Sequence, residues 1–312
     1  MHEENRSSLL PIDELQRELT DLENGSFASL TDSELRDKVR AIHTGFVFQA
    51  PTFPTGTLIY RAVRVSQRPA RKSRVGYPPV QLAKTNGRLN RPGEGMFYGS
   101  MSQFASCLYE CSFKVGEFFA ISAWLTTQIM TFNHLGYSTK VLEASKSNRN
   151  LPFFAQMKEQ GQSDRVRLIR EWQARVFTQR VPPDQDHLYR LPIALKDFAL
   201  GKMVQVDPKL PDVFSGVIYP SIAMWLLADN VAILPTEVDA KLALFEVILL
   251  VVDGTQEIHR EDGSNVTQVA MKMYDYARAD TSGNLIWGQR SQVVYPDGTD
   301  ASRFTPHVLA PE

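Results

Sequence analysis

The sequence predicts an α+β protein, with helices first, a mixed β-sheet core next and a β-rich C-terminal extension last. Three observations support this class. Apolar residues recur at helical spacing within the first 50 residues. Runs of β-branched and aromatic residues dominate the middle of the chain, and glycine-containing turns punctuate the segment after residue 252. We therefore expect a helical region over 1–50, a core domain over 51–256 and a β-rich extension over 257–312.

Composition places the chain among ordinary globular proteins, since 43% of its 312 residues are hydrophobic and 22% are charged. The net charge of −1 gives no electrostatic reason to bind nucleic acid or an anionic membrane. The only cysteines, Cys107 and Cys111, are four residues apart, which suits neither a disulfide framework nor a zinc site. The first ten residues lack an apolar stretch, and no stretch is long enough to span a membrane. We expect a cytoplasmic protein.

Two amphipathic helices are expected before residue 50. Residues 12–22 repeat leucine and isoleucine at a spacing that places them along one helical face. Thr31-Asp-Ser-Glu34 has the spacing of a capping box, with Leu30 and Leu35 as its hydrophobic staple. Because amphipathic helices usually bury their apolar stripe within their own chain, we expect this appendage to pack on the core. Self-association is the alternative.

A strand with an embedded arginine follows the proline-rich linker at 51–56. Residues 57–65 are rich in β-branched and aromatic types and include Arg61, which is either a solvated strand residue or part of a pocket. The next loop, 66–79, has three arginines, one lysine and no acid. It is either a lid over an anion or a solvated mobile loop, and a single short basic run favours the mobile loop.

The segment 86–110 concentrates residue types that bind anionic and aromatic ligands. It begins with a turn rich in Gly, Pro and Asn, where a backbone can approach a ligand closely, and Arg88 lies inside this turn. Arginine supplies a forked donor suited to phosphate or carboxylate. A short apolar strand then delivers Tyr98, and a helix capped by Ser102 carries Glu110 on its last turn.

After residue 110 the sequence predicts both strands and helices, followed by a β-rich tail that reaches residue 294. A polar stretch at 145–163 is expected to lie on the surface. The last buried strand, 242–252, is an apolar run that we expect to be covered on both faces. The further expected elements are strands at 118–127 and 129–135, helices at 163–177 and 188–200, and strands at 213–221, 231–234 and 242–252.

Motifs for other chemistries are absent from the sequence. There is no phosphate-binding Walker loop, no dinucleotide-binding GxGxxG, no HExxH and no nucleophile elbow. The six histidines are scattered without the spacing of metal ligands, so we expect no metal.

A resemblance to a known family rests on five short motifs in one order: Gly87-Arg88-x-Asn90, Phe97-Tyr98, Leu108-Tyr109-Glu110, Pro220-Ser221 and Asp229-Asn230. In these motifs the chain resembles the RES domain family over roughly residues 57–235. It departs from the family at Leu89, where tryptophan is usual. The interval between Glu110 and Ser221 is also longer than in compact members.

The resemblance implies a fold similar to that of the ADP-ribosylating toxins and an enzyme that degrades NAD⁺. Breaking the nicotinamide–ribose bond builds positive charge on the ribose, as in glycoside hydrolysis. On this reading Glu110 is the main catalytic residue, because its carboxylate would stabilise that charge. Arg88 would hold the diphosphate or orient the nicotinamide ribose, through charge-assisted hydrogen bonds. Ser221 would hydrogen-bond the ribose or position Glu110.

Three further residues are expected to contact NAD⁺, namely Arg61, Asn90 and Tyr98. Tyr98 would stack on the nicotinamide ring or donate its hydroxyl. Each has an ordinary structural reading as well, such as a half-buried strand aromatic for Tyr98. No cofactor is expected, because NAD⁺ is the substrate and inorganic phosphate is at most a co-substrate. The nicotinamide ring is cationic before it leaves, so the reaction needs no strong general acid.

The acceptor and the biological role stay open in the sequence. Leu108 stands where transferases that modify protein arginine commonly have an acid, which favours water or phosphate as acceptor over a macromolecule. An ADP-ribosyltransferase is therefore one alternative, and a catalytically silent nucleotide- or partner-binding domain is another. Many members of the RES family are toxins of bacterial toxin–antitoxin pairs, inhibited by a helix-turn-helix antitoxin. A homodimer is the general expectation for such enzymes.

Overall fold

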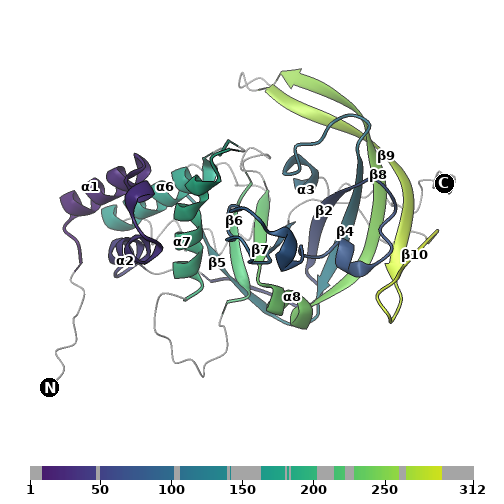
Figure 1. The fold of residues 1–312 in the computed structure, drawn as a ribbon, viewed down its shortest axis with the longest axis horizontal. Coiled ribbons are helices and arrows are strands. Elements are labelled where there is room, and N and C mark those ends of the chain that lie inside the picture. The colour runs from purple at the N-terminus through teal and green to yellow at the C-terminus, as the bar shows by residue number, and fades with distance from the viewer. Residues whose placement is uncertain are drawn as a thin grey trace. The chain divides into compact units, whose positions relative to one another are not determined.

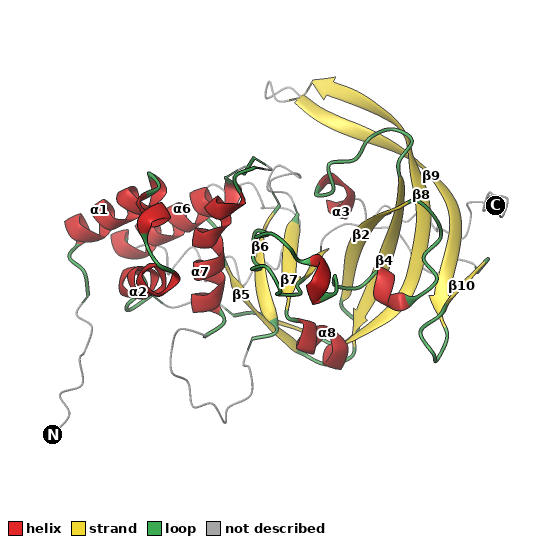
Figure 2. Ribbon diagram, viewed as in Figure 1, coloured by secondary structure: helices red, strands yellow, loops and turns green. Residues whose placement is uncertain are grey.

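A computed structural model describes residues 9–46, 50–101, 106–138, 141, 163–179, 181–182, 184–201, 214–221, 228–259 and 265–289. These residues form an α+β protein with six α-helices and ten strands (Figure 1 and Figure 2), which confirms the predicted class. The chain divides into two compact units. Unit 1 holds residues 1–53, 79–96 and 130–234, and unit 2 holds residues 54–78, 97–129 and 235–312. The polypeptide therefore passes from one unit to the other five times.

Two amphipathic helices, α1 (Ile12–Glu23) and α2 (Asp32–Ile42), begin unit 1 as predicted. The capping box is present, because Glu34 N donates to Thr31 Oγ1 at 3.3 Å and Thr31 N donates to Glu34 Oε2 at 2.7 Å. Apart from Ile12, which is exposed, the apolar stripes of both helices are buried, which confirms that they pack within their own chain. The buried stripe residues are Leu15, Leu19, Leu22, Leu35, Val39 and Ile42.

The two helices predicted in the middle of the chain also belong to unit 1, as α6 (Asp164–Thr178) and α7 (Arg190–Ala199). Helix α1 contacts α6, and α2 contacts α7. Helix α6 buries Trp172 in this layer of helices. Helix α7 also buries two charged residues, Lys196 and Asp197. Because eight of its ten residues are buried, α7 has no single apolar stripe.

The strands of unit 1 are β1 (Thr52–Phe53), β5 (Met130–His134), β6 (Gly216–Pro220) and β7 (Asp229–Ile233). They are ordered β1-β5-β6-β7, with β5 parallel to β6 and the other two pairs antiparallel. Gly216 begins β6 where β7 approaches closely, since a Cβ atom there would lie 2.1 Å from the carbonyl oxygen of Ala232. A glycine is therefore required for β6 and β7 to pair.

The strands of unit 2 are ordered β3-β2-β4-β8-β9-β10, and every neighbouring pair is antiparallel. Strands β8 and β9 form a long hairpin (Figure 1). Two short helices, α3 (Ser106–Tyr109) and α8 (Pro235–Lys241), complete the unit. The proposed cap at Ser102 and the stretch 145–162 lie outside the described residues. The strands are β2 (Leu58–Val65), β3 (Phe97–Ser100), β4 (Phe118–Thr126), β8 (Leu242–His259), β9 (Asn265–Ala279) and β10 (Leu285–Trp287).

The basic loop between β2 and β3 is anchored at Arg68 and Lys72, whereas Arg71 and Arg74 are exposed to solvent as expected. Arg68 Nη2 pairs with Asp275 Oδ2 at 2.8 Å. Lys72 N donates to the carbonyl of Gly283 at 2.8 Å, and its Nζ lies 5.3 Å from the centroid of the Trp124 ring. The partners come from β4, β9 and the turn after β9, and local sequence cannot show them. Tertiary contacts therefore hold a loop whose composition alone resembles that of a solvated one.

A buried histidine links the two pairs of helices in unit 1. His43 follows α2, and its ring centroid lies 4.9 Å from that of Phe198 and 6.1 Å from that of Trp172. Its Nδ1–H donates to the carbonyl of Val39 at 2.7 Å, so Nε2 accepts from Gln173 Nε2 at 2.9 Å. Burial in these surroundings lowers the pKa of His43 from 6.5 to about 4, because the charged form is poorly solvated.

We expect unit 1 to lose stability in mild acid through His43. As the pH falls, the unfolded chain binds a proton near 6.5, whereas the folded protein does so only near 4. The contribution of neutral His43 is complete above pH 6.5 and is lost towards pH 4, a total of about 3 kcal/mol. Urea unfolding at about pH 7.5 and about pH 5 measures the part of this loss that occurs above pH 5, about 2 kcal/mol. His43→Gln should show a smaller decline, and an equal decline in both proteins would contradict the assignment.

Candidate functional site

Two of the predicted site residues meet in unit 2. Arg61, on β2, donates from Nε to the carbonyl of Gly76 at 2.9 Å and from Nη1 to the carbonyl of Tyr98 at 2.7 Å. Its guanidinium carbon lies 5.4 Å from the centroid of the Phe97 ring. Burial lowers the pKa of Arg61, and no carboxylate of the described residues contributes to that pKa. The guanidinium is thus held in place by neutral groups, which leaves its charge available to an anion.

Glu110 lies in the same part of unit 2. It directly follows α3 and is exposed. The pKa of the neighbouring Cys111 thiol depends on burial and on nearby charges. Burial raises this pKa, the positive charge of Arg61 lowers it, and the negative charge of Glu110 raises it. One thiol is therefore within electrostatic reach of both the guanidinium and the carboxylate.

The backbone after Glu110 is fixed in an uncommon conformation. Ser112 has φ 48°, in the left-handed region that non-glycine residues seldom adopt. Arg64 Nη2 donates to the carbonyls of Cys111 and Ser112 at 3.1 and 3.3 Å and so supports this turn from β2. On the other side of Glu110, α3 is anchored by Leu108, which is buried in the core. Strained backbone of this kind occurs frequently at functional sites.

The Arg88 turn belongs to unit 1. Gly87 N donates to the carbonyl of Asn90 at 2.9 Å, which closes the turn. Arg88 Nη1 donates to the carbonyl of Phe177, and Nη2 donates to that of Gln179 at 3.4 Å, both at the end of α6. A guanidinium at a helix C-terminus satisfies carbonyls that have no partner within the helix. Arg88 therefore has a structural role at the end of α6, beside any role with a ligand.

The neighbours of Arg88 in this turn are enclosed. Asn90 is 9% exposed, and its Nδ2 donates to the carbonyl of Arg91 at 3.2 Å. Leu89 is fully buried and serves as the apolar anchor of the turn.

Ser221 lies at the end of β6, where its N–H donates to the carbonyl of Ala228 at 2.9 Å, and it is fully buried. A second carboxylate lies nearby, because Asp229 pairs with Pro220 in the register of β6 and β7. Tyr137 donates its hydroxyl to Asp229 Oδ1 at 2.5 Å. A buried phenol–carboxylate pair therefore supports the strand ends that hold Ser221.

Sequence reasoning missed a buried glutamate in unit 2. Glu246 interrupts the apolar run of β8 and is 1% exposed. It pairs with Ala123 of β4, next to a register shift, and Ala123 pairs in turn with Tyr60 of β2. Burial raises the pKa of Tyr60, and the charge of Glu246 raises it further. The detectable signal was a single acid within a run of eleven otherwise uncharged residues, 242–252.

The six predicted residues are divided equally between the units. In unit 2, Arg61 contacts the backbone carbonyl of Tyr98, and Glu110 follows α3 next to Cys111. In unit 1, Arg88 and Asn90 share a turn, and Ser221 ends β6. Phe177 connects the Arg88 turn to β6. Arg88 donates to the carbonyl of Phe177, and the ring centroid of Phe177 lies 5.8 Å from that of Tyr219 on β6.

Neither a metal centre nor a membrane segment is found in the described part of the chain. No three His, Cys, Asp or Glu side chains within it are grouped to hold a metal ion. None of its helices combines the length and the apolar character needed to cross a bilayer. Comparison with models of protein families gives no match, and comparison with curated proteins gives none either.

Proposed function

We propose that this protein cleaves the nicotinamide–ribose bond of NAD⁺ and transfers the ADP-ribose to water or inorganic phosphate. The observation that supports this most is Arg61, a cation held by two neutral backbone carbonyls in the unit that also carries Tyr98 and the exposed Glu110. A fixed cation, an aromatic residue and an exposed carboxylate are the groups that a dinucleotide with a cationic ring requires. The order of motifs shared with the RES domain family supports the same reaction.

The proposed reaction needs one carboxylate at the ribose. As the bond from ribose C1′ to the nicotinamide nitrogen breaks, its electron pair moves to that nitrogen and the ring leaves as a neutral molecule. Positive charge then builds on the ribose, and the carboxylate of Glu110 stabilises it. A water molecule adds to C1′ and releases a proton, or a phosphate oxygen adds and yields the 1″-phosphate.

The other residues are proposed to bind and orient the substrate. Arg61 attracts the negative charge of the diphosphate, and Tyr98 stacks on the nicotinamide ring. In unit 1, the roles proposed for Arg88, Asn90 and Ser221 follow from the resemblance. For Arg88 the remaining N–H groups would serve the ligand, since a guanidinium has five and two of its nitrogens already bind the end of α6.

Incubation of the purified protein with NAD⁺, with and without inorganic phosphate, tests the proposal. If water is the acceptor, we expect nicotinamide and ADP-ribose in both conditions. If phosphate is the acceptor, we expect nicotinamide and ADP-ribose 1″-phosphate, and only when phosphate is present. Product separation by liquid chromatography distinguishes the two outcomes. Unchanged NAD⁺ in both conditions would contradict the proposed function.

Labelled NAD⁺ distinguishes the alternative functions. Transfer of label to a macromolecule would identify an ADP-ribosyltransferase, and tight binding without turnover would identify a silent binding domain. The proposed biological role is that of a cytoplasmic toxin in a toxin–antitoxin pair, or a related effector. It predicts that expression depletes cellular NAD⁺ and that a cognate helix-turn-helix antitoxin prevents this depletion.

A further inference from the structure

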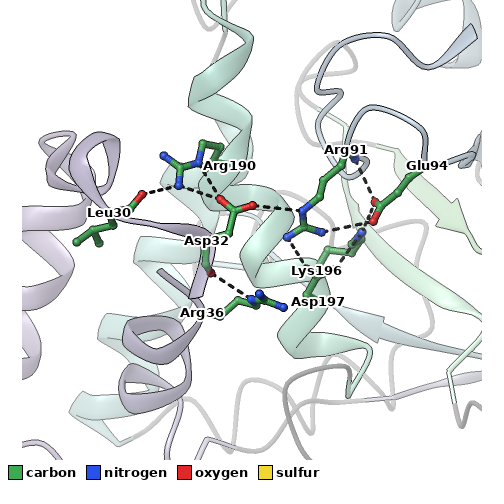
Figure 3. Close-up of polar contacts among 8 residues, drawn as sticks. All are labelled: Leu30, Asp32, Arg36, Arg91, Glu94, Arg190, Lys196 and Asp197. Atoms are coloured by element: carbon green, nitrogen blue, oxygen red, sulfur yellow. Dashed lines mark hydrogen bonds and ion pairs between the residues drawn. The ribbon is translucent and has the colours of Figure 1, made fainter. Parts of the chain in front are cut away.

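A second turn directly follows the Arg88 turn and faces α7 (Figure 3). In this turn Glu94 N donates to the carbonyl of Arg91 at 3.0 Å, and Arg91 N donates to Glu94 Oε2 at 3.1 Å. Gly93, with φ 78°, provides the backbone conformation, and its N–H donates to the carbonyl of Ala83 at 2.8 Å. The Arg88 turn is therefore continuous with a turn whose two end residues are charged.

Four charges close a ring between this second turn and α7. Arg91 Nη2 lies 2.7 Å from Asp197 Oδ2, and Lys196 Nζ lies 3.1 Å from Asp197 Oδ1. Lys196 Nζ also lies 3.2 Å from Glu94 Oε2, and Arg91 Nη1 lies 3.5 Å from Glu94 Oε1. The side chains of Lys196 and Asp197 are only 1% and 7% exposed. Two cations and two anions balance, so the ring is neutral although it is mostly buried.

The ring also extends to the N-terminal helices (Figure 3). Asp32, the first residue of α2, accepts from Arg190 Nη2 at 2.8 Å and lies 3.8 Å from Arg91 Nε. Arg190 Nη2 donates in addition to the carbonyl of Leu30 at 2.6 Å. Charged side chains thus connect the start of α2, both ends of α7 and the turn within unit 1.

Apolar packing is incomplete beside this ring. A half-open pocket of about 260 Å³ lies beside the turn, and its lining includes Leu35 and Ala194 as well as the charged residues Asp32, Arg91 and Arg190. Beside this pocket, the ion pairs to Lys196 and Asp197 link the turn to α7.

We infer that Lys196 and Asp197 are positioning residues for the turn that carries Arg88 and Asn90. They act through Arg91 and Glu94 and touch no ligand. Stability alone does not call for these charges, because apolar residues often replace a buried ion pair without loss. A closed ring instead specifies one placement of the turn on α7. The consequence for NAD⁺ binding rests on the proposed function, whereas the placement of the turn does not.

Hydrogen exchange measured by mass spectrometry tests the placement directly. In Lys196→Met, amides of the segment 86–95 are expected to exchange at least about tenfold faster than in the wild type. Lys38→Met is the matched control, since it removes the 2.5 Å ion pair between Lys38 and Glu18 in the same unit but leaves the ring intact. Exchange at 86–95 should not change in that control.

The kinetics of NAD⁺ cleavage separate positioning from general destabilisation. Lys196→Met is expected to raise the KM for NAD⁺ about tenfold while kcat changes less than about threefold, because Glu110 is untouched. Adding Glu94→Gln to Lys196→Met should lower the KM for NAD⁺ part of the way back to the wild-type value. The double variant rebalances the charge and keeps the pair between Arg91 and Asp197.

Two results of the exchange measurement would contradict the positioning role of Lys196. Unchanged exchange at 86–95 in Lys196→Met overturns it, as does an equal increase in Lys38→Met. If Lys196→Met does not fold, Arg91→Gln gives the same test, because the side chain of Arg91 is 27% exposed and its loss is easier to accommodate. If the wild type leaves NAD⁺ intact, the proposed function fails, and the exchange comparison still decides whether the ring places the turn.

Discussion

Glu110→Gln is expected to reduce nicotinamide release from NAD⁺ by at least about 100-fold, the typical loss when one electrostatic partner of a transition state is removed. Glutamine keeps the shape of the side chain but cannot offset a positive charge on the ribose. The fold should persist, because Glu110 is exposed and substitutions at exposed positions seldom affect stability. Circular dichroism and the urea midpoint check the fold, and a discontinuous assay of nicotinamide checks the rate.

Glu257→Gln is the matched control for this experiment. Glu257 is an exposed acid on β8 whose carboxylate accepts from Thr267 Oγ1 at 2.5 Å, and we assign it no role in the reaction. Its variant should retain wild-type activity. Full activity in Glu110→Gln would remove Glu110 from the proposed mechanism and would direct attention to Glu246, a buried acid of the same unit.

Gly216→Ala is expected to destabilise unit 1 by more than about 3 kcal/mol, since a new methyl group must displace backbone rather than a side chain. The added Cβ would lie 2.1 Å from the carbonyl oxygen of Ala232 and 3.0 Å from the carbonyl carbon of the same residue. Strands β6 and β7 would have to separate at this pair. Urea unfolding followed by tryptophan fluorescence measures the shift in midpoint.

Gly254→Ala provides the comparison within the same protein. A Cβ atom at Gly254 on β8 would meet only the Cβ of Ala270, at 3.8 Å, which is an ordinary contact distance. This variant should unfold within about 1 kcal/mol of the wild type, because alanine also restricts the unfolded chain. Equal midpoints for the two alanine variants would mean that β6 and β7 do not approach as closely as described.

Local signals in the sequence were sufficient for most elements. The capping box of Thr31 and Glu34 located α2 to the residue, because both partners lie within one turn of helix. The apolar spacing of α1 likewise predicted that Leu15, Leu19 and Leu22 are buried. Such features depend on neighbours a few residues away, and a sequence displays those neighbours directly.

Features that depend on distant partners could not be predicted. Lys196 and Asp197 resemble solvated helix residues until Arg91 and Glu94, about a hundred positions earlier, are placed beside them. The loop that includes Arg68 resembles a mobile basic loop for the same reason, since its partner Asp275 lies on β9. Among the candidate site residues, the sequence indicated the chemistry of Arg61 but not its contact with the Tyr98 carbonyl.

The five passages between the units determine when each can fold during synthesis. Unit 1 needs residues up to 234 for its last strand, and the described part of unit 2 needs those up to 289. A nascent chain therefore cannot complete either unit until most of its length has left the ribosome. Contacts that span so much sequence also slow the search for the native pairing. An activity that needs residues of both units would therefore appear only after residue 289 has been synthesised.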